Sequence, residues 1–256
     1  MPAEPTLRVY LAGSTCIERG SVLVPRSSFP GRQGRLVFAV LATRRWEPTP
    51  REALADAVWD ESRPSAWETA LRAIMSKLRA LLSGVGLEGD PIRADSGCYR
   101  LLLPLDAWID VEAAEDAVHR AEASLRLGDA DECVGWALVA ASVGARSFLP
   151  GEEGAFVDRW RERLRSVRIR ALEARGGALL LRREFELAAR DAETALGLAP
   201  FRESCLQLLM RAHVAAGNAA EALRAYERTR RLMADELGVD PSAESRALFA
   251  GILAER

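Results

Sequence analysis

Side chains that can bond to nucleic acid recur at helical spacing in residues 66–82, AWETALRAIMSKLRALL. The apolar residues of this segment return every three or four positions, which predicts a helix with one apolar side: Trp67, Ala70, Leu71, Ile74, Leu78 and Leu81. The opposite side carries the candidate DNA-contacting residues Thr69, Arg72, Ala73, Ser76, Lys77 and Arg79. Arg72 can donate two hydrogen bonds to a guanine edge, whereas Lys77 and Arg79 carry the charge to contact phosphates.

The simpler alternative is an ordinary solvated helix face, which is how any one of these residues would be interpreted alone. Glu68 raises a second question, because a carboxylate near a helix start repels phosphate but suits the positive end of the helix dipole. We favour the dipole role. Two others stay open, in which Glu68 accepts a hydrogen bond from cytosine N4 or marks weakened DNA binding.

The segments around residues 66–82 match the elements that position a DNA-reading helix. Short β-branched segments fill the first 30 residues, and an amphipathic helix follows from Gly34. A shorter helix is predicted at 51–59, with Thr49 as its N-cap and Pro50 in its first turn. IRADSGCYRLLL then predicts a hairpin that turns at residues 95–97. Two helices followed by a hairpin are the layout of a winged helix-turn-helix.

Further arginines flank these elements. Arg93 precedes the hairpin turn, where a wing arginine can reach a neighbouring groove or phosphates. GRQGR at 31–35 lacks the Lys-Ser/Thr of a phosphate-binding loop, so we interpret it as a helix start. Arg32 and Arg35 are then expected to contact the DNA backbone, since helix N-termini favour phosphate. Residues 1–105 hold 14 basic and 11 acidic side chains, a small positive excess of 3.

A repeat pattern begins after residues 104–108. Residues 186–200 align with 219–233 at an offset of 34, and residues 128–141 form a third, diverged unit. This is the tetratricopeptide period, whose stacked repeats share a core and present a concave binding surface. We therefore predict a mainly α chain with two domains. They are an α+β winged helix-turn-helix at 1–105 and an all-α tetratricopeptide-like domain at 106–256.

Catalysis, a metal site, a cofactor and a membrane span receive no support from the sequence. The two histidines and four cysteines are scattered, and neither G-x-S-x-G nor G-x-x-x-x-G-K-[ST] occurs. Carboxylate pairs such as Glu152–Glu153 are interpreted as charged surface. No apolar run approaches the ~20 residues of a membrane helix. The start lacks the pattern of a signal peptide, so we expect a cytoplasmic, non-enzymatic protein.

These segments together resemble the SARP/AfsR-type bacterial regulators, named for antibiotic regulatory proteins, over residues 7–253. In the first half, the resemblance is carried by GRQGRLVFAVL, REALADAVW, ETALRAIMSKLRALL and SGCYRLLL. In the second half, EALRAYERTRRLMADELGVDPSAESRAL is similar to a signature of the bacterial transcriptional activator domain.

The resemblance implies a nucleoid-associated transcriptional activator that binds promoter direct repeats in double-stranded DNA as a homodimer. It alone implies that RNA polymerase contacts the loop between the second and third helices, at Asp60, Glu61, Ser62 and Arg63. A ligand or protein in the repeat-domain groove is a further expectation. The alternative is a protein-interaction adaptor whose winged helix no longer binds DNA, which Glu68 and the small positive charge would favour. Salt-dependent binding to duplex DNA separates the two hypotheses.

Overall fold

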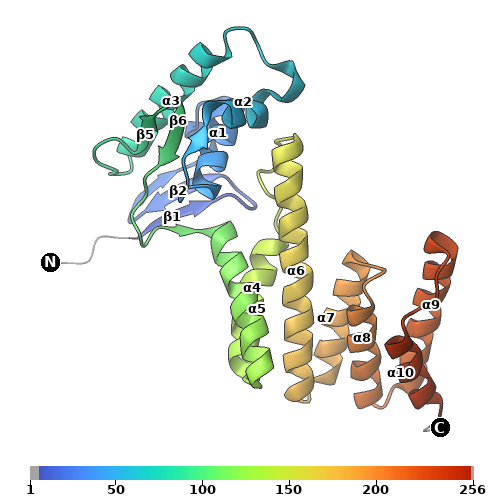
Figure 1. The fold of residues 1–256 in the computed structure, drawn as a ribbon. Coiled ribbons are helices and arrows are strands. Elements are labelled where there is room, and N and C mark those ends of the chain that lie inside the picture. The colour runs from blue at the N-terminus through green and yellow to red at the C-terminus, as the bar shows by residue number, and fades with distance from the viewer. Residues whose placement is uncertain (1–5, 255–256) are drawn as a thin grey trace. The chain divides into compact units, whose positions relative to one another are not determined.

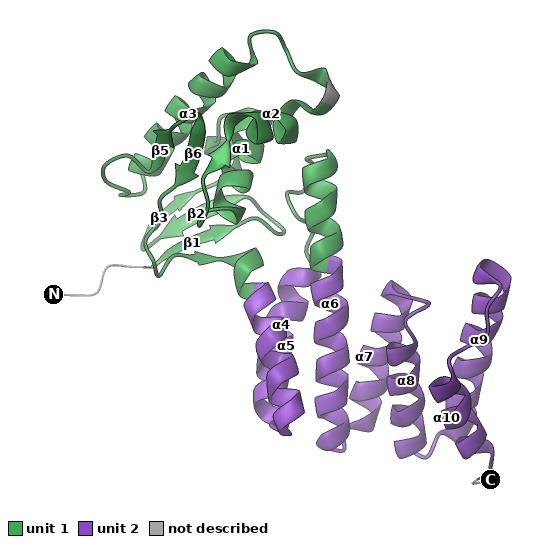
Figure 2. Cartoon of the chain, in the orientation of Figure 1, with its two compact units in different colours: residues 1–113, 146–164 green, residues 114–145, 165–256 purple. Residues whose placement is uncertain are grey.

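The chain forms two compact units that interleave along the sequence. The computed structural model describes residues 6–254, except for the side chain of Glu61. The first unit comprises residues 1–113 and 146–164, and the second comprises 114–145 and 165–256 (Figure 2). The first unit thus includes residues 146–164, which the sequence pattern places in the repeat domain. The functional boundary at residue 105 stays a prediction.

A small sheet opens the first unit (Figure 1). β1 (Leu7–Tyr10), β2 (Cys16–Arg19) and β3 (Val22–Val24) are antiparallel, and β7 (Trp108–Ile109) pairs in parallel with β1. The strand order is β3-β2-β1-β7. Leu7, Val9 and Ile17 are buried and alternate with residues that are partly or fully exposed, as expected for a sheet with one face on a core.

Three helices pack beside this sheet: α1 (Gly31–Thr43), α2 (Arg51–Trp59) and α3 (Trp67–Ser83), with short 3₁₀ turns η1 (Arg26–Ser28) and η2 (Asp60–Ser62). Their core includes the fully buried side chains of Phe38, Leu54 and Leu71. The N-cap prediction for Thr49 is wrong. Thr49 lies in β4 (Thr49–Pro50) and pairs with Tyr99, and α2 starts after Pro50 without a side-chain cap.

The predicted wing is present. β5 (Ile92–Asp95) and β6 (Cys98–Leu101) form an antiparallel hairpin, and β4 extends it to a sheet of order β4-β6-β5. Ser96 and Gly97 both have positive φ, 47° and 79°, as a two-residue type I′ turn requires. The winged helix-turn-helix is therefore confirmed.

The chain from residue 110 onward is helical, as predicted. Its helices are α4 (Asp110–Leu127), α5 (Ala130–Gly144), α6 (Ala155–Leu181), α7 (Phe185–Leu198), α8 (Glu203–Ala215), α9 (Ala219–Leu237) and α10 (Ala243–Ala254). Equivalent small residues of the repeats, Ala188 and Ala222, are fully buried. A Cβ on Gly176 of α6 would lie 2.8 Å from Leu208 of α8, so this glycine permits close helix packing.

One turn geometry recurs in all three repeats. Gly128, Arg183 and Gly217 have left-handed backbones, with φ of 78°, 62° and 77°. Each donates its N–H to the carbonyl three residues earlier, and the next residue donates to the carbonyl five residues earlier. This αL arrangement ends a helix and suits glycine. Two repeats use glycine, and the middle one uses arginine.

We therefore expect Arg183→Gly to raise the free energy of unfolding by about 1 kcal/mol, because glycine removes the left-handed strain. Urea denaturation measures the change. Arg190→Gly is the matched control, since Arg190 is an exposed arginine inside α7. There glycine is expected to lower stability by about 1 kcal/mol. A loss of stability in both variants would contradict the strain at Arg183.

Candidate nucleic-acid interface

α3 divides cleanly into a buried and an exposed side. Leu71, Ile74, Met75, Leu78 and Leu82 are buried against the first unit. The predicted residues Thr69, Arg72, Ala73, Ser76 and Lys77 are all exposed. Their spacing of three and four places them along one side of the helix. An α-helix with one side free has the form that fits the major groove.

Arg72 and Lys77 are the two exposed cations on this side. The Arg72 side chain is 68% exposed and contacts only Glu68, through the backbone carbonyl at 3.3 Å and a carboxylate oxygen at 3.9 Å. The Lys77 side chain has no hydrogen bond or ion pair with any residue the structure describes. Both side chains can therefore reorient toward a ligand without breaking a strong contact.

Arg79 behaves differently from these two. Its Nε donates to Asp90 Oδ1 at 2.8 Å and to the backbone carbonyl of Ile92, which also accepts from Nη2. These bonds join the C-terminal part of α3 to the first strand of the wing. The structure gives Arg79 a role within the fold, and its phosphate contact stays a prediction.

Glu68 lies between two arginines. One carboxylate oxygen is 3.5 Å from Arg51 Nη1 of α2, and the other is 3.9 Å from Arg72 Nη2. Hydrogen bonding to Glu52, with the charge of Glu68 beside it, raises the pKa of Arg51. Glu68 is also in the first turn of α3, which has no side-chain cap. Its charge is thus balanced by neighbouring cations as well as by the helix dipole.

The wing presents Arg93 to solvent on β5. Its turn is anchored, because the N–H of Arg51 at the start of α2 donates to the carbonyl of Gly97 at 3.1 Å. Arg100 on β6 points elsewhere and donates to the carbonyl of Arg45 at 3.2 Å. Arg93 and the exposed side of α3 thus belong to one unit, joined by the contacts of Arg79 and Arg51.

The loop predicted to meet polymerase is the short turn η2. Asp60 has φ 48° and begins this turn. Arg63 forms an ion pair with Asp56, and its guanidinium lies 5.0 Å from the Trp67 ring centre. Ser62 is exposed, and the side chain of Glu61 lies outside the described residues. The proposed role of this loop stays a prediction.

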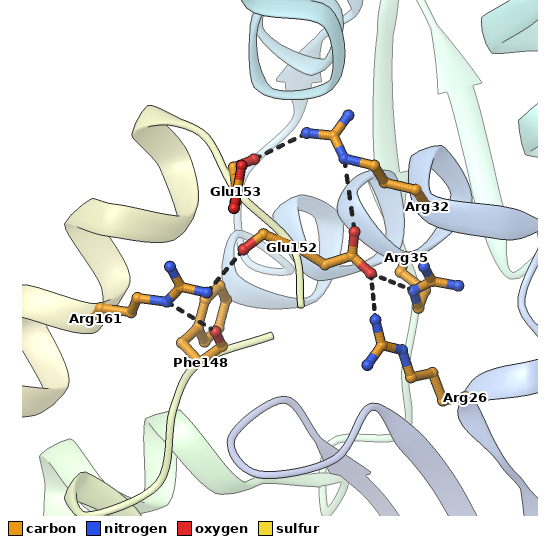
Figure 3. Close-up of polar contacts among 7 residues, drawn as sticks. All are labelled: Arg26, Arg32, Arg35, Phe148, Glu152, Glu153 and Arg161. Atoms are coloured by element: carbon orange, nitrogen blue, oxygen red, sulfur yellow. Dashed lines mark hydrogen bonds and ion pairs between the residues drawn. The ribbon is translucent and has the colours of Figure 1, made fainter. Parts of the chain in front are cut away.

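A buried carboxylate accounts for other arginines that we expected on DNA. Glu152 is 1% exposed and pairs with Arg26 at 2.9 Å, Arg32 at 3.7 Å and Arg35 at 2.6 Å (Figure 3). The structure therefore places Arg32 and Arg35 in an ion-pair cluster around Glu152, and their contact with the DNA backbone stays a prediction. The interpretation of Glu152 as charged surface is wrong, because residues 146–164 pack into the first unit and bury it.

The same segment is held by several other bonds. Arg161 donates to the backbone carbonyls of Glu152 at 2.7 Å and Phe148 at 3.4 Å, and Arg32 donates to that of Glu153 at 2.9 Å (Figure 3). The Phe148 ring stacks on Trp160, with centres 5.4 Å apart. Residues 146–164 are therefore part of the fold of the first unit. We call Glu152 with Arg26, Arg32 and Arg35 the Glu152 cluster.

Asp110 is a second buried carboxylate that the sequence did not indicate. It accepts hydrogen bonds from the backbone N–H groups of Leu11, Ala12 and Val111 at 2.8–3.0 Å. Burial raises its pKa to about 6, against the opposing effect of these three bonds. Asp110 thus joins the start of α4 to the end of β1 within the first unit.

Groups suited to catalysis are not gathered anywhere in the described residues. No three His, Cys, Asp or Glu side chains among them could hold a metal ion. Burial raises the pKa of Cys133 to about 11 and that of Cys205 to about 12, so both thiols are protonated at neutral pH. Within residues 6–254, no helix is long and apolar enough to cross a membrane.

Comparison with known proteins matches both parts of the chain. A profile of the family described as "Bacterial transcriptional activator domain" matches residues 109–253. The regulatory protein AfsR of Streptomyces griseus is 33% identical over 250 residues, which cover 96% of this chain and 24% of AfsR. The transcriptional regulatory protein EmbR of Mycobacterium tuberculosis is 28% identical over 226 residues, covering 87% of this chain and 58% of EmbR.

A solved structure extends this similarity to the fold. The structure titled M. tuberculosis EmbR in complex with low affinity phosphopeptide has a TM-score of 0.88 and 25% identity. The match covers 99% of this chain and 66% of that one. The chain therefore spans about a quarter of AfsR and about two thirds of the EmbR structure.

Proposed function

Because this chain belongs to the bacterial transcriptional activator domain family, as a SARP-type regulator, we propose that it regulates transcription by binding DNA through its first unit. The observation that carries the proposal is the exposed side of α3, where Thr69, Arg72, Ser76 and Lys77 face solvent while the opposite side is buried. A helix held in this way can enter the major groove and read base edges.

Each exposed residue has a proposed task. Arg72 donates to guanine O6 and N7, and Lys77 contacts a phosphate. Thr69 and Ser76 bond to a base edge or to a phosphate, and Ala73 packs against bases. Arg93 reaches the backbone from the wing. Phosphate contacts of this kind fix the register of the helix, so that Arg72 meets the same base pair each time.

The remaining parts of the proposed function are those that the family resemblance implies. We propose that two copies bind promoter direct repeats side by side and activate transcription by contacting RNA polymerase through the loop of Asp60, Glu61, Ser62 and Arg63. The repeat helices supply the surface for dimerisation or for a ligand or protein signal. Such a regulator acts on the nucleoid in the cytoplasm and needs no cofactor.

Duplex binding as a function of salt tests this function against the adaptor hypothesis. A regulator that neutralises several phosphates releases counterions, so log K falls linearly with log salt with a slope of about −0.9 per phosphate contact. We expect a slope of about −4 or steeper on any duplex longer than 20 base pairs. An adaptor whose winged helix no longer binds DNA would show no binding at low salt.

Glu68→Gln is expected to raise affinity for non-specific duplex DNA about threefold to tenfold. The substitution removes a negative charge beside the phosphates and frees Arg51 and Arg72, whose ion pairs with Glu68 are 3.5 and 3.9 Å long. Fluorescence anisotropy at low salt measures the change.

Glu88→Gln is the matched control for this variant. Glu88 is exposed in the same unit and has no partner among the described residues, so its removal changes the net charge equally. We expect it to change affinity less than twofold. If Glu68→Gln instead weakened binding to one sequence only, Glu68 would be reading a cytosine, and the repulsive role would be wrong.

A further inference from the structure

An exposed face of α5, in the repeat at residues 128–141, carries no charge. Gly135, Leu138, Val139 and Ser142 follow one another at spacings of one, three and three or four residues that place them on one side of the helix, and all four are exposed. Leu138 is 53% exposed and Val139 is 41% exposed. We call these four residues the α5 face and propose that it packs against the α5 face of a second copy of this chain. The proposal rests on the proposed function, in which two copies bind side by side, and names the surface through which they touch.

The other two repeats show what the outer side of such a helix carries when solvent covers it. Gly128, Arg183 and Gly217 mark the same place in the three repeats, and α5, α7 and α9 each begin two residues later. Where α5 has Gly135 and Leu138, the other two helices have charged residues: Arg190 and Glu193 in α7, and Arg224 and Glu227 in α9. In α5, by contrast, residues 133–145 include no charged side chain. The α5 face therefore has the composition of a helix side that is covered.

Gly135 adds an independent observation, because the fold of the chain does not require a glycine there. Its backbone is not left-handed, and a Cβ built on it would meet no described atom within 4 Å. Gly176 differs, since a Cβ there would lie 2.8 Å from Leu208. A glycine inside a helix destabilises it relative to alanine, and its advantage is that another backbone can approach closely. At Gly135 that other backbone would belong to the second copy.

The α5 face is complementary to itself about a two-fold axis. Its order is small, Leu138, Val139, small, so an antiparallel second copy sets Leu138 against Val139 of that copy and Gly135 against its Ser142. A contact between identical surfaces requires such self-complementarity. Charge selects the antiparallel orientation. The acidic first turn, residues 131–132, then lies at opposite ends of the two helices, whereas a parallel pair would set these carboxylates side by side.

The size of the α5 face suits copies that DNA already holds together. One pair of 15-residue helices covers less than the roughly 800 Å² per partner of a stable interface, so we expect weak association in solution, with a Kd of about 0.1 mM. Two copies on neighbouring sites of one DNA have an effective concentration of about 1 mM. The contact would then strengthen binding of the second copy by about tenfold.

Sedimentation of the full chain over a concentration series, without DNA, tests the proposal. We expect a monomer–dimer equilibrium that Gly135→Leu weakens by about tenfold or more, because the added side chain holds the two backbones apart. The same variant should have a higher urea midpoint, since leucine favours the helix. Gly197→Leu is the matched control. Gly197 is an exposed glycine of α7, also with nothing within 4 Å of an added Cβ, and this variant should associate like the native chain.

Val139→Glu repeats the test with charge. It sets two carboxylates together at the centre of the contact, so association should again weaken by about tenfold or more. Thr194→Glu is its control, because Thr194 is exposed at the equivalent position of α7 and the added charge is the same. It should leave the equilibrium unchanged.

Two results would overturn the proposal. One is a native chain that stays monomeric over the whole concentration series. The other is equal association of the native chain and both α5 variants, which would show that the copies meet elsewhere or that the α5 face binds a different protein. The proposed function is judged separately by duplex binding. If the chain associates through α5 but binds no duplex, the contact stands and the proposed function fails.

Discussion

Replacing Arg72 and Lys77 with alanine is expected to lower affinity for the operator about 100-fold. Loss of a two-bond contact between an arginine and guanine costs about 1–3 kcal/mol, and loss of a phosphate contact adds a smaller, salt-dependent amount. Because both side chains are exposed and make no strong bonds within the protein, the substitutions should leave the fold intact. The slope of log K against log salt should become shallower by about 1.

The single variants separate the two roles. Arg72→Ala should lose most of the preference for the operator over other sequences, whereas Lys77→Ala should weaken binding to all duplexes equally. Arg228→Ala/Arg231→Ala removes the same charge from α9 in the second unit and is expected to change affinity less than threefold. If this control were as damaging as the α3 double variant, net charge would explain binding and the proposed reading of bases by α3 would be wrong.

Replacing Glu152 with glutamine is expected to lower the free energy of unfolding by about 3 kcal/mol. Removing one partner of a buried ion pair leaves the remaining charges uncompensated, which costs about 3–5 kcal/mol. The lower end applies, because Arg26 and Arg32 are 40% and 49% exposed and can regain water, whereas Arg35 is only 15% exposed. Urea denaturation followed by circular dichroism measures the loss.

Glu153→Gln is the control next to Glu152 in the chain. Glu153 is exposed, and Arg32 contacts its backbone carbonyl, which the substitution keeps. We expect a change below 0.5 kcal/mol. Equal stabilities of the two variants would show that the Glu152 cluster does not hold residues 146–164 in the first unit. The cluster would then be a set of weak surface pairs.

Features set by neighbouring residues were predictable from the sequence. The period of α3 separates its apolar residues from Thr69, Arg72 and Ser76, and the structure places the two sets on opposite sides. Met75 is buried although the apolar stripe did not include it, because the buried side is wider than a strict three-and-four spacing. The repeats were visible because equivalent small residues such as Ala188 and Ala222 must be buried in each.

Contacts between distant parts of the chain could not be predicted in this way. Glu152 and Arg35 are 117 residues apart, and Asp110 and Leu11 are 99 apart. No periodicity or motif relates such pairs, so the sequence alone does not reveal that a charged residue such as Glu152 is buried. The N-cap prediction for Thr49 failed for the same reason, because Thr49 pairs with the distant Tyr99 of the wing and so belongs to a strand. A fragment that ends at residue 105 would therefore lack Glu152 and Asp110, although both belong to the first unit.

Selection of bound fragments from sheared genomic DNA tests the central claim most directly. The full chain and the Arg72→Ala/Lys77→Ala variant are run side by side at the same salt concentration. We predict that the native chain enriches one repeated sequence motif and that the variant enriches none. If neither protein enriches any fragment even at low salt, the exposed side of α3 is only a solvated surface, and the DNA-binding function is contradicted in favour of the adaptor.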